Sequence, residues 1–176
     1  MPELEFHYVL QVRPIEQDEL PIFAFVLQDT ARFLFERGIG LWPPGSLAPD
    51  ELLKSYAVPE MRLGLLGRES VAAMVLQERD DLFWPDAPEG ESLFLHKLAV
   101  HRNFQGRGIA RGMLDAARSE AVTRGKSFLR LDTAADRPKL RALYEGYGFE
   151  LVDERQVGSF FVVRYELPLD SASKSG

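Results

Sequence analysis

Two glycines stand at the start of an expected helix in AVHRNFQGRGIARGML, residues 99–114. A strand-like apolar stretch precedes Gly106 and Gly108, and no Ser or Thr caps the helical pattern that follows. The first N–H groups of a helix lack partners and carry partial positive charge, and glycine lets an anion approach them closely. The segment therefore indicates a phosphate site, with the alternative that the glycines only shape a turn whose donors bind water.

Two common nucleotide-binding signatures do not match this segment well. The P-loop requires GxxxxGK[ST], and the chain has no such string. The dinucleotide fingerprint is closer, because Asp132 ends the next expected strand. However, Arg111 occupies its third glycine or alanine position, and five residues separate the strand from the first glycine. A dinucleotide-binding domain therefore remains the less favoured alternative.

A third signature matches better. The segment resembles the acyl-CoA pyrophosphate loop of the GCN5-related N-acetyltransferase (GNAT) superfamily, whose pattern Gln/Arg-x-x-Gly-x-Gly/Ala is met by Gln105, Gly108 and Ala110. ALYEGYGFE, residues 142–150, resembles a second landmark of that superfamily, a short helix running into Tyr-x-x-x-Gly-Phe. The resemblance covers residues 92–167 and implies an α/β (α+β) fold. We expect a single GNAT-like domain with a central mixed, mostly antiparallel, twisted sheet whose strands splay apart between flanking helices.

The resemblance also implies that acetyl-CoA is the co-substrate and assigns residues to it. Backbone groups of Leu98 and Val100 would bind the pantetheine arm, and the amides of residues 105–110 would cradle the pyrophosphate. Tyr144 matches the tyrosine that protonates the departing thiolate, and Arg137 stands where the superfamily often has an Asn that contacts the cofactor. The expected cofactor-binding residues are Leu98, Ala99, Val100, Arg102, Gln105, Gly106, Arg107, Gly108, Ile109, Ala110, Arg137 and Tyr144.

The expected general base is His96, in the stretch LFLHKLAV. Alternation along a strand puts His96, Leu98 and Val100 on one face, which the resemblance turns toward the cofactor. The arylalkylamine acetyltransferase branch carries a histidine at the same place. Glu78, at the end of the preceding strand, is the alternative base or water holder, and Asp132 could also serve. A histidine in an apolar strand is, on the other hand, often a hydrogen-bonded core residue.

The expected reaction is direct transfer of the acetyl group to a primary amine within a ternary complex. A base must deprotonate the amine before it attacks the thioester, and an acid helps the thiolate leave. A backbone N–H near Leu98 would hold the tetrahedral oxyanion. The absence of cysteine agrees with a route that needs no covalent enzyme intermediate. The alternative is a non-catalytic CoA-binding or regulatory module on the same scaffold.

The acceptor is expected to be a small-molecule amine. Aromatic side chains near carboxylates suit a cationic amine, and Trp42, Phe83 and Trp84 are the candidate substrate-binding residues. Phe160 and Phe161, in the expected last hairpin, could also line the pocket. The alternative for residues 80–91 is a solvated loop pinned by one buried tryptophan.

Composition excludes several classes of protein. The 176 residues carry a net charge of −6, which argues against general nucleic-acid binding, although residues 101–141 alone carry +6. Zero cysteines and only three histidines led us to expect no metal site. No apolar run approaches the roughly 20 residues of a membrane span, and MPELEFHY does not resemble a signal peptide. We expect a cytoplasmic protein with no membrane partner, and a homodimer is possible.

Hydrophobic periodicity and turn residues predict alternating strands and helices in one domain over residues 1–169, followed by a disordered tail at 170–176. The expected strands are 5–13, 61–66, 71–78, 92–100, 127–133, 149–154 and 160–167, and the expected helices are 16–37, 50–56, 109–124 and 138–147.

Overall fold

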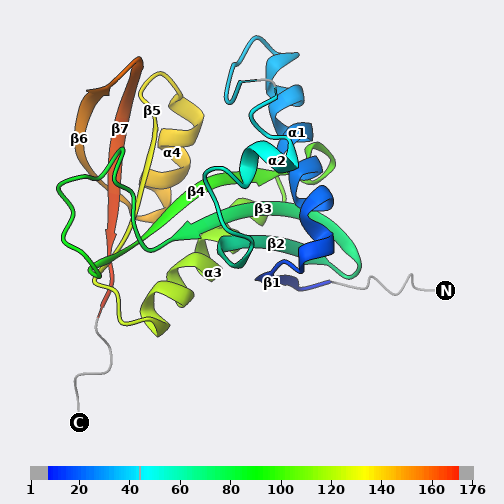
Figure 1. Ribbon diagram of the computed structural model, residues 1–176, viewed down its shortest axis with the longest axis horizontal. Coiled ribbons are helices and arrows are strands. Elements are labelled where there is room, and N and C mark those ends of the chain that lie inside the picture. The colour runs from blue at the N-terminus through cyan, green and yellow to red at the C-terminus, as the bar shows by residue number, and fades with distance from the viewer. Residues whose placement is uncertain (1–7, 44, 171–176) are drawn as a thin grey trace. The chain divides into compact units, whose positions relative to one another are not determined.

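The computed structural model describes residues 8–43 and 45–170, which form an α/β fold around one seven-stranded sheet (Figure 1). The strand order is β1-β2-β3-β4-β5-β7-β6. The β4/β5 pair is parallel, whereas β1/β2, β2/β3, β5/β7 and β6/β7 are antiparallel, so the predicted mixed, mostly antiparallel sheet is confirmed. The strands are β1 (Leu10–Pro14), β2 (Met61–Leu66), β3 (Glu69–Gln77), β4 (Ser92–Val100), β5 (Phe128–Ala134), β6 (Glu150–Val157) and β7 (Phe160–Pro168).

Four α-helices and three 3-10 turns complete the described chain. They are η1 (Gln17–Glu19), α1 (Leu20–Phe35), α2 (Pro49–Leu52), η2 (Val58–Glu60), η3 (Arg102–Phe104), α3 (Ile109–Thr123) and α4 (Pro138–Tyr147). None of the helices in the described part of the chain has the length and apolar character of a membrane span.

The chain divides into two compact units that share strand β4. The first unit comprises the residues up to Val75 together with Lys97–Met113, and the second comprises Leu76–His96 together with the residues from Leu114 onward. The peptide bond between His96 and Lys97, inside β4, is therefore a boundary between the units. The domain limits 1–169 remain a prediction, and the expected tail lies outside the described residues except for Asp170.

The core of the first unit lies between α1 and the sheet. Leu20, Phe23 and Leu27, predicted to share one helix face, are almost fully buried and belong to one cluster with Met61 and Leu63 of β2. Burial of each such side chain contributes about 1.5–3 kcal/mol. The helix begins at Leu20, later than predicted, because a 3-10 turn occupies residues 17–19 and a proline follows at the first helical turn.

Two glycines let the beginning of α3 approach β1 and β2 within the first unit. A Cβ at Gly64 would lie 2.7 Å from Met113 Sδ, and a Cβ at Gly112 would lie 2.6 Å from a methyl carbon of Leu10. Real Cβ atoms do not come this close to other heavy atoms. Glycine at both positions therefore lets the start of α3 pack directly against the strands. The loop that precedes the helix is held in place by this packing.

The second unit contains the parallel β4/β5 ladder and the β5-β7-β6 sheet. The ladder consists of three residue pairs and ends at Phe94 and Arg130, although both strands continue beyond them. The two strands therefore part, as a splayed pair should. Helix α4 packs against β7 through the ring of Tyr144, whose centroid lies 6.1 Å from that of Tyr165.

Candidate active site

The loop between β4 and α3 has a backbone conformation that favours glycine at two positions. Gly106 and Gly108 both have φ of 76°, a left-handed conformation that side chains other than glycine rarely adopt. A Cβ at either glycine would have no heavy atom of the described chain within 4 Å. Steric crowding therefore does not require glycine at either position. The positive φ of both residues does.

Gln105, the first residue of the loop motif, ties the loop to the strand. Its Nε2 donates a hydrogen bond of 2.8 Å to the carbonyl oxygen of Val100, which also accepts one of 3.1 Å from Thr30 Oγ1 of α1. Both bonds lie inside the first unit. They fix the path of the chain between the strand end and the glycines.

The two arginines assigned to the phosphates differ in their surroundings. Arg102 donates from its backbone N–H and its Nε to the carboxylate of Asp29, and its Nη1 lies 3.5 Å from Glu36 Oε2. Its charge is therefore balanced by α1. Arg107 is exposed, and its guanidinium lies 5.3 Å from the ring centre of Phe104. Of these two arginines, Arg107 has the charge that is more available to an anion.

Lys97 has a backbone conformation that is unusual for its residue type. Its φ of 55° lies in the left-handed region, and among the described residues other than glycine no other has a positive φ. Such a conformation costs about 1–2 kcal/mol and interrupts a regular strand. The irregularity directly precedes Leu98, the residue whose N–H was predicted to hold the oxyanion.

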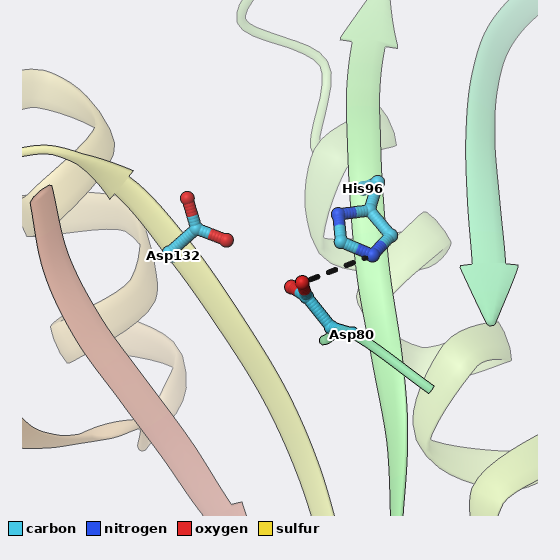
Figure 2. Close-up of side chains that lie close together, drawn as sticks. All are labelled: Asp80, His96 and Asp132. Atoms are coloured by element: carbon cyan, nitrogen blue, oxygen red, sulfur yellow. Dashed lines mark ion pairs between the residues drawn. The ribbon is translucent and has the colours of Figure 1, made fainter. Parts of the chain in front are cut away.

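His96 lies in the second unit beside two carboxylates (Figure 2). Its Nε2 is 3.8 Å from Asp80 Oδ2, and the side chains of His96 and Asp80 are 14% and 6% exposed. Asp132 of β5 completes the group, with one atom from each side chain lying within 4.8 Å of the others. His96 and Asp132 each follow the last β4/β5 residue pair by two positions, so the parting of the strands makes room for the cluster.

Asp80 was missed as a partner of His96 by sequence reasoning. It lies just after β3, where its Oδ1 accepts hydrogen bonds from the backbone N–H groups of Leu82 and Phe83. Its buried Oδ2 accepts no hydrogen bond from any residue that the structure describes. The turn thus orients the carboxylate, and one of its oxygens faces the imidazole. No motif links residues 80 and 96, so only the folded chain reveals the pair.

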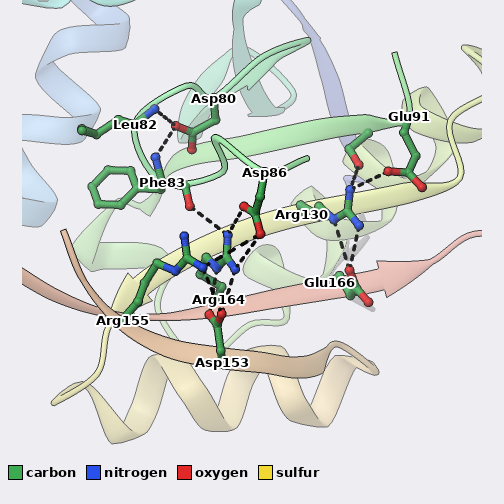
Figure 3. A network of polar contacts seen from close by, with 11 residues as sticks. Asp80, Leu82, Phe83, Asp86, Glu91, Arg130, Asp153, Arg155, Arg164 and Glu166 are labelled. Carbon is green, nitrogen blue, oxygen red and sulfur yellow. Dashed lines mark hydrogen bonds and ion pairs between the residues drawn. The ribbon is translucent and has the colours of Figure 1, made fainter. Parts of the chain in front are cut away.

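Arg164 of β7 anchors the loop that carries Asp80 (Figure 3). Its side chain is 2% exposed and donates to Asp153, to Asp86 and to the carbonyl oxygen of Phe83. The Arg164 hydrogen bond lowers the pKa of Asp86 from its usual range to about 2. The same guanidinium therefore fixes both the sheet edge and the 80–86 loop.

Glu78, the alternative base, is engaged elsewhere. It forms ion pairs with Lys126 and Arg124, and half of its side chain is exposed. The hydrogen bond from Lys126, together with the one from Arg124, lowers the pKa of Glu78. A carboxylate with a lowered pKa is a poor acceptor for the proton of an amine at neutral pH.

Tyr144 is buried on the inner face of α4. Its ring packs edge-on against Phe149, with ring centres 5.7 Å apart, in a cluster that includes Tyr165. Burial, and next the negative charge of Asp132, raise the pKa of Tyr144. The phenol is therefore protonated throughout the neutral range, and its electrostatic environment includes one member of the His96 cluster.

The expected substrate-binding aromatics have different surroundings. Trp42 lines a cavity of about 320 Å³ in the first unit, together with residues of α1, and Lys97 Nζ lies 4.8 Å from its ring centre. Trp84 is 5% exposed and lies beside the guanidinium groups of Arg130 and Arg164. Trp84 is therefore held among the protein's own side chains, which matches the alternative of a loop pinned by a buried tryptophan.

Two other expected site residues have partners in the second unit. Phe83 packs edge-on against Phe160, with ring centres 6.1 Å apart. Arg137, at the start of α4, pairs with its neighbour Asp136 at 3.3 Å. The assignment of Arg137 to a phosphate stays a prediction.

The fold and this loop define the class of the protein. The family model described as Acetyltransferase (GNAT) family matches residues 43–149, well over half of the chain. The chain therefore belongs to the GNAT acetyltransferase family, and the predicted superfamily is confirmed. The particular likeness to the arylalkylamine branch stays a prediction.

Relatives of this chain are found among curated proteins and solved structures. It is 35% identical over 89 residues to the uncharacterized N-acetyltransferase YesJ of Bacillus subtilis, which covers 48% of this chain and 49% of YesJ. The chain thus spans about half the length of this curated relative. A GNAT acetyltransferase of Listeria monocytogenes shares the fold with a TM-score of 0.69 and 23% identity, covering 90% of this chain and 95% of its own.

A third relative has a ligand in its structure. The GNAT acetyltransferase of Elizabethkingia anophelis, solved with acetyl-CoA bound, has a TM-score of 0.65 and 19% identity, covering 91% of this chain and 98% of its own. At this identity the likeness establishes the fold alone.

Proposed function

We propose that the chain moves the acetyl group of acetyl-CoA directly to the primary amine of a small molecule. The loop of residues 105–110 carries this proposal. It combines two left-handed glycines, open space around them, and the start of a helix, whose first N–H groups have no partner within the helix itself. The exposed Arg107 adds positive charge, and backbone groups of residues 98–100 are the expected contacts for the pantetheine arm.

His96 is the proposed general base. It removes a proton from the ammonium of the acceptor, and the amine nitrogen then attacks the thioester carbonyl carbon. Asp80 lies 3.8 Å from the imidazole and stabilises the imidazolium that forms, as the aspartate of a Ser-His-Asp triad does for its histidine. Glu78 is the less suitable base because its ion pairs hold it as a carboxylate with a lowered pKa.

Tyr144 is proposed to assist the leaving group. When the carbon–sulfur bond breaks, the phenol donates a hydrogen bond to the thiolate of CoA, and the thiolate takes up the second proton that the acylated nitrogen releases as the amide forms. Because the pKa of Tyr144 is raised, complete proton transfer from the phenol is uphill. Tyr144 therefore stabilises the sulfur chiefly as a hydrogen-bond donor. The N–H of Leu98, after the irregular Lys97, is the proposed donor to the oxyanion.

The acceptor is proposed to be a small cationic amine. The paired carboxylates near His96 suit an ammonium group. A cytoplasmic location and a homodimer remain predictions.

Acetyl-CoA binding is the first test. The melting temperature should rise with the acetyl-CoA concentration, because a ligand that binds only the folded state stabilises it. Gly108→Ala should reduce this rise, whereas Gly125→Ala is the matched control. Gly125 also has a positive φ, 71°, and open surroundings, but it follows the other end of α3. Equal ligand shifts in both variants would contradict the loop assignment.

Thiol release over a panel of amines is the second test. His96→Gln should lower kcat by about 10²–10⁴ and remove the neutral-pH limb of the rate profile, without changing the affinity for acetyl-CoA. Glu78→Gln should keep most activity. An unchanged pH profile in His96→Gln would assign the base elsewhere, and acetyl-CoA binding without transfer to any amine would favour the non-catalytic module.

A further inference from the structure

The cluster of Asp80, His96 and Asp132 has the composition of a metal site. Each residue offers one ligand atom, and the three atoms lie within 4.8 Å of one another (Figure 2). One imidazole nitrogen with two carboxylate oxygens is a donor set that Zn²⁺ and similar divalent transition-metal ions accept. We propose that these three residues bind such an ion, with Zn²⁺ as the expected one, and that the bound ion inhibits acetyl transfer.

The carboxylate of Asp80 supplies independent support. Its side chain is 6% exposed, and its buried Oδ2 accepts no hydrogen bond from any described residue. Its Oδ1 is held by the N–H groups of Leu82 and Phe83, so the carboxylate cannot readily turn away. A buried carboxylate oxygen that accepts no hydrogen bond is costly. A cation between Asp80 and His96 removes that cost.

The spacing permits coordination with small side-chain movements. Ligand atoms of a tetrahedral zinc ion lie about 3.4 Å apart, since each bond is about 2.0–2.2 Å long. His96 Nε2 and Asp80 Oδ2 are 3.8 Å apart, close to that value. The remaining separations of up to 4.8 Å close when the carboxylate of Asp132 moves by up to about 1.4 Å toward the pair. Three protein ligands leave the fourth position to water.

Charge also favours a divalent ion. Two carboxylates beside a neutral imidazole carry two negative charges in a site where every member is at least partly buried. A divalent cation balances them. No cysteine takes part, and the ligands are separated by 16 and 36 residues, so zinc motifs built on short ligand spacings would not indicate this site.

The inhibitory part of this inference rests on the proposed function, and the binding part does not. A neutral imidazole that binds the ion through Nε2 keeps its remaining proton on Nδ1, so neither ring nitrogen can accept a proton from the acceptor. The ion would also occupy the position of the acceptor ammonium. Zn²⁺ should therefore compete with the amine.

Cobalt provides a test of binding that needs no activity. Protein free of any histidine tag is treated with a chelator and titrated with Co²⁺. The visible absorption of Co²⁺ strengthens when nitrogen and oxygen ligands hold the ion with a low coordination number. We expect one Co²⁺ per chain, displaced by Zn²⁺. Asp132→Asn and His96→Gln should each weaken Co²⁺ binding by more than about tenfold, since even loss of an outer partner costs 10–100-fold.

His101→Gln is the matched control. His101 Nε2 lies 3.5 Å from Asp29 Oδ2 in the first unit, a similar pair that joins no third metal-ligating side chain among the residues described. This variant should bind Co²⁺ as the wild type does. Thermal melts check that each variant is folded.

Three results would overturn the inference. They are a wild-type protein with no Co²⁺ absorption band, an Asp132→Asn variant with unchanged affinity, and loss of binding in His101→Gln. If Co²⁺ binds at the cluster but Zn²⁺ does not slow transfer, the inhibitory part is wrong. If no amine is acetylated, the proposed function fails while the cobalt result still decides the binding part.

Discussion

Replacing Arg164 by methionine should destabilise the second unit and displace the loop that carries Asp80. The Arg164 side chain is 2% exposed, and its guanidinium lies 2.7 Å from Asp86 and 2.8 Å from Asp153. Removing one partner of a buried ion pair costs about 3–5 kcal/mol. Here the two carboxylates are 58% and 35% exposed, so they regain water after the change. We therefore expect a loss of about 2–3 kcal/mol in the free energy of unfolding.

Urea unfolding measures this loss, and Arg155→Met is the matched control. Arg155 contacts the same two carboxylates, at 3.9 Å and 3.4 Å, but its side chain is 31% exposed. Its replacement should cost less than about 1 kcal/mol. In Arg164→Met, an NMR titration should also show the pKa of Asp86 rising from about 2 toward its ordinary value. Equal losses in the two variants, or an unchanged pKa of Asp86, would refute the anchoring role.

Three further predictions concern stability at acidic pH, the close packing at Gly64 and the stability of helix α4. The unfolding free energy should fall as the pH drops from about 5 to 2, because the Arg13 and Arg164 hydrogen bonds lower the pKa values of Glu19 and Asp86 to about 2. Their stabilisation is present above the unfolded-state pKa values and is lost as the carboxylates protonate. Urea titrations across this range check it, and a flat profile would contradict it. Gly64→Ala should cost about 1–3 kcal/mol, since its Cβ would lie 2.7 Å from a sulfur atom. Gly146→Ala, with open space inside α4, should instead raise stability by about 0.5–1 kcal/mol; thermal melts measure both, and equal signs would contradict the packing argument.

Local patterns were sufficient to predict most elements and to single out the loop of residues 105–110. The buried face of α1 follows helical spacing, and the loop motif lies within six consecutive residues. Gly106 and Gly108 both have a positive φ, the backbone state in which glycine is favoured.

Side-chain partners distant in sequence could not be predicted. Arg102 was assigned to phosphate, yet its nearest carboxylate belongs to Asp29, 73 residues earlier. The pairing of His96 with Asp80 depends on the turn after β3, and the proximity of Asp132 depends on where two strands part. Such contacts arise from tertiary packing, for which one sequence contains no local signal.

The hydrogen bond from Gln105 to Val100 has a kinetic consequence. A loop whose path is already fixed by its own protein loses little conformational entropy when a ligand arrives. Its N–H groups would meet a diphosphate without a preceding rearrangement, so association should show a single phase whose rate rises linearly with ligand concentration. The affinity of the loop would then be decided mainly by how slowly the ligand leaves.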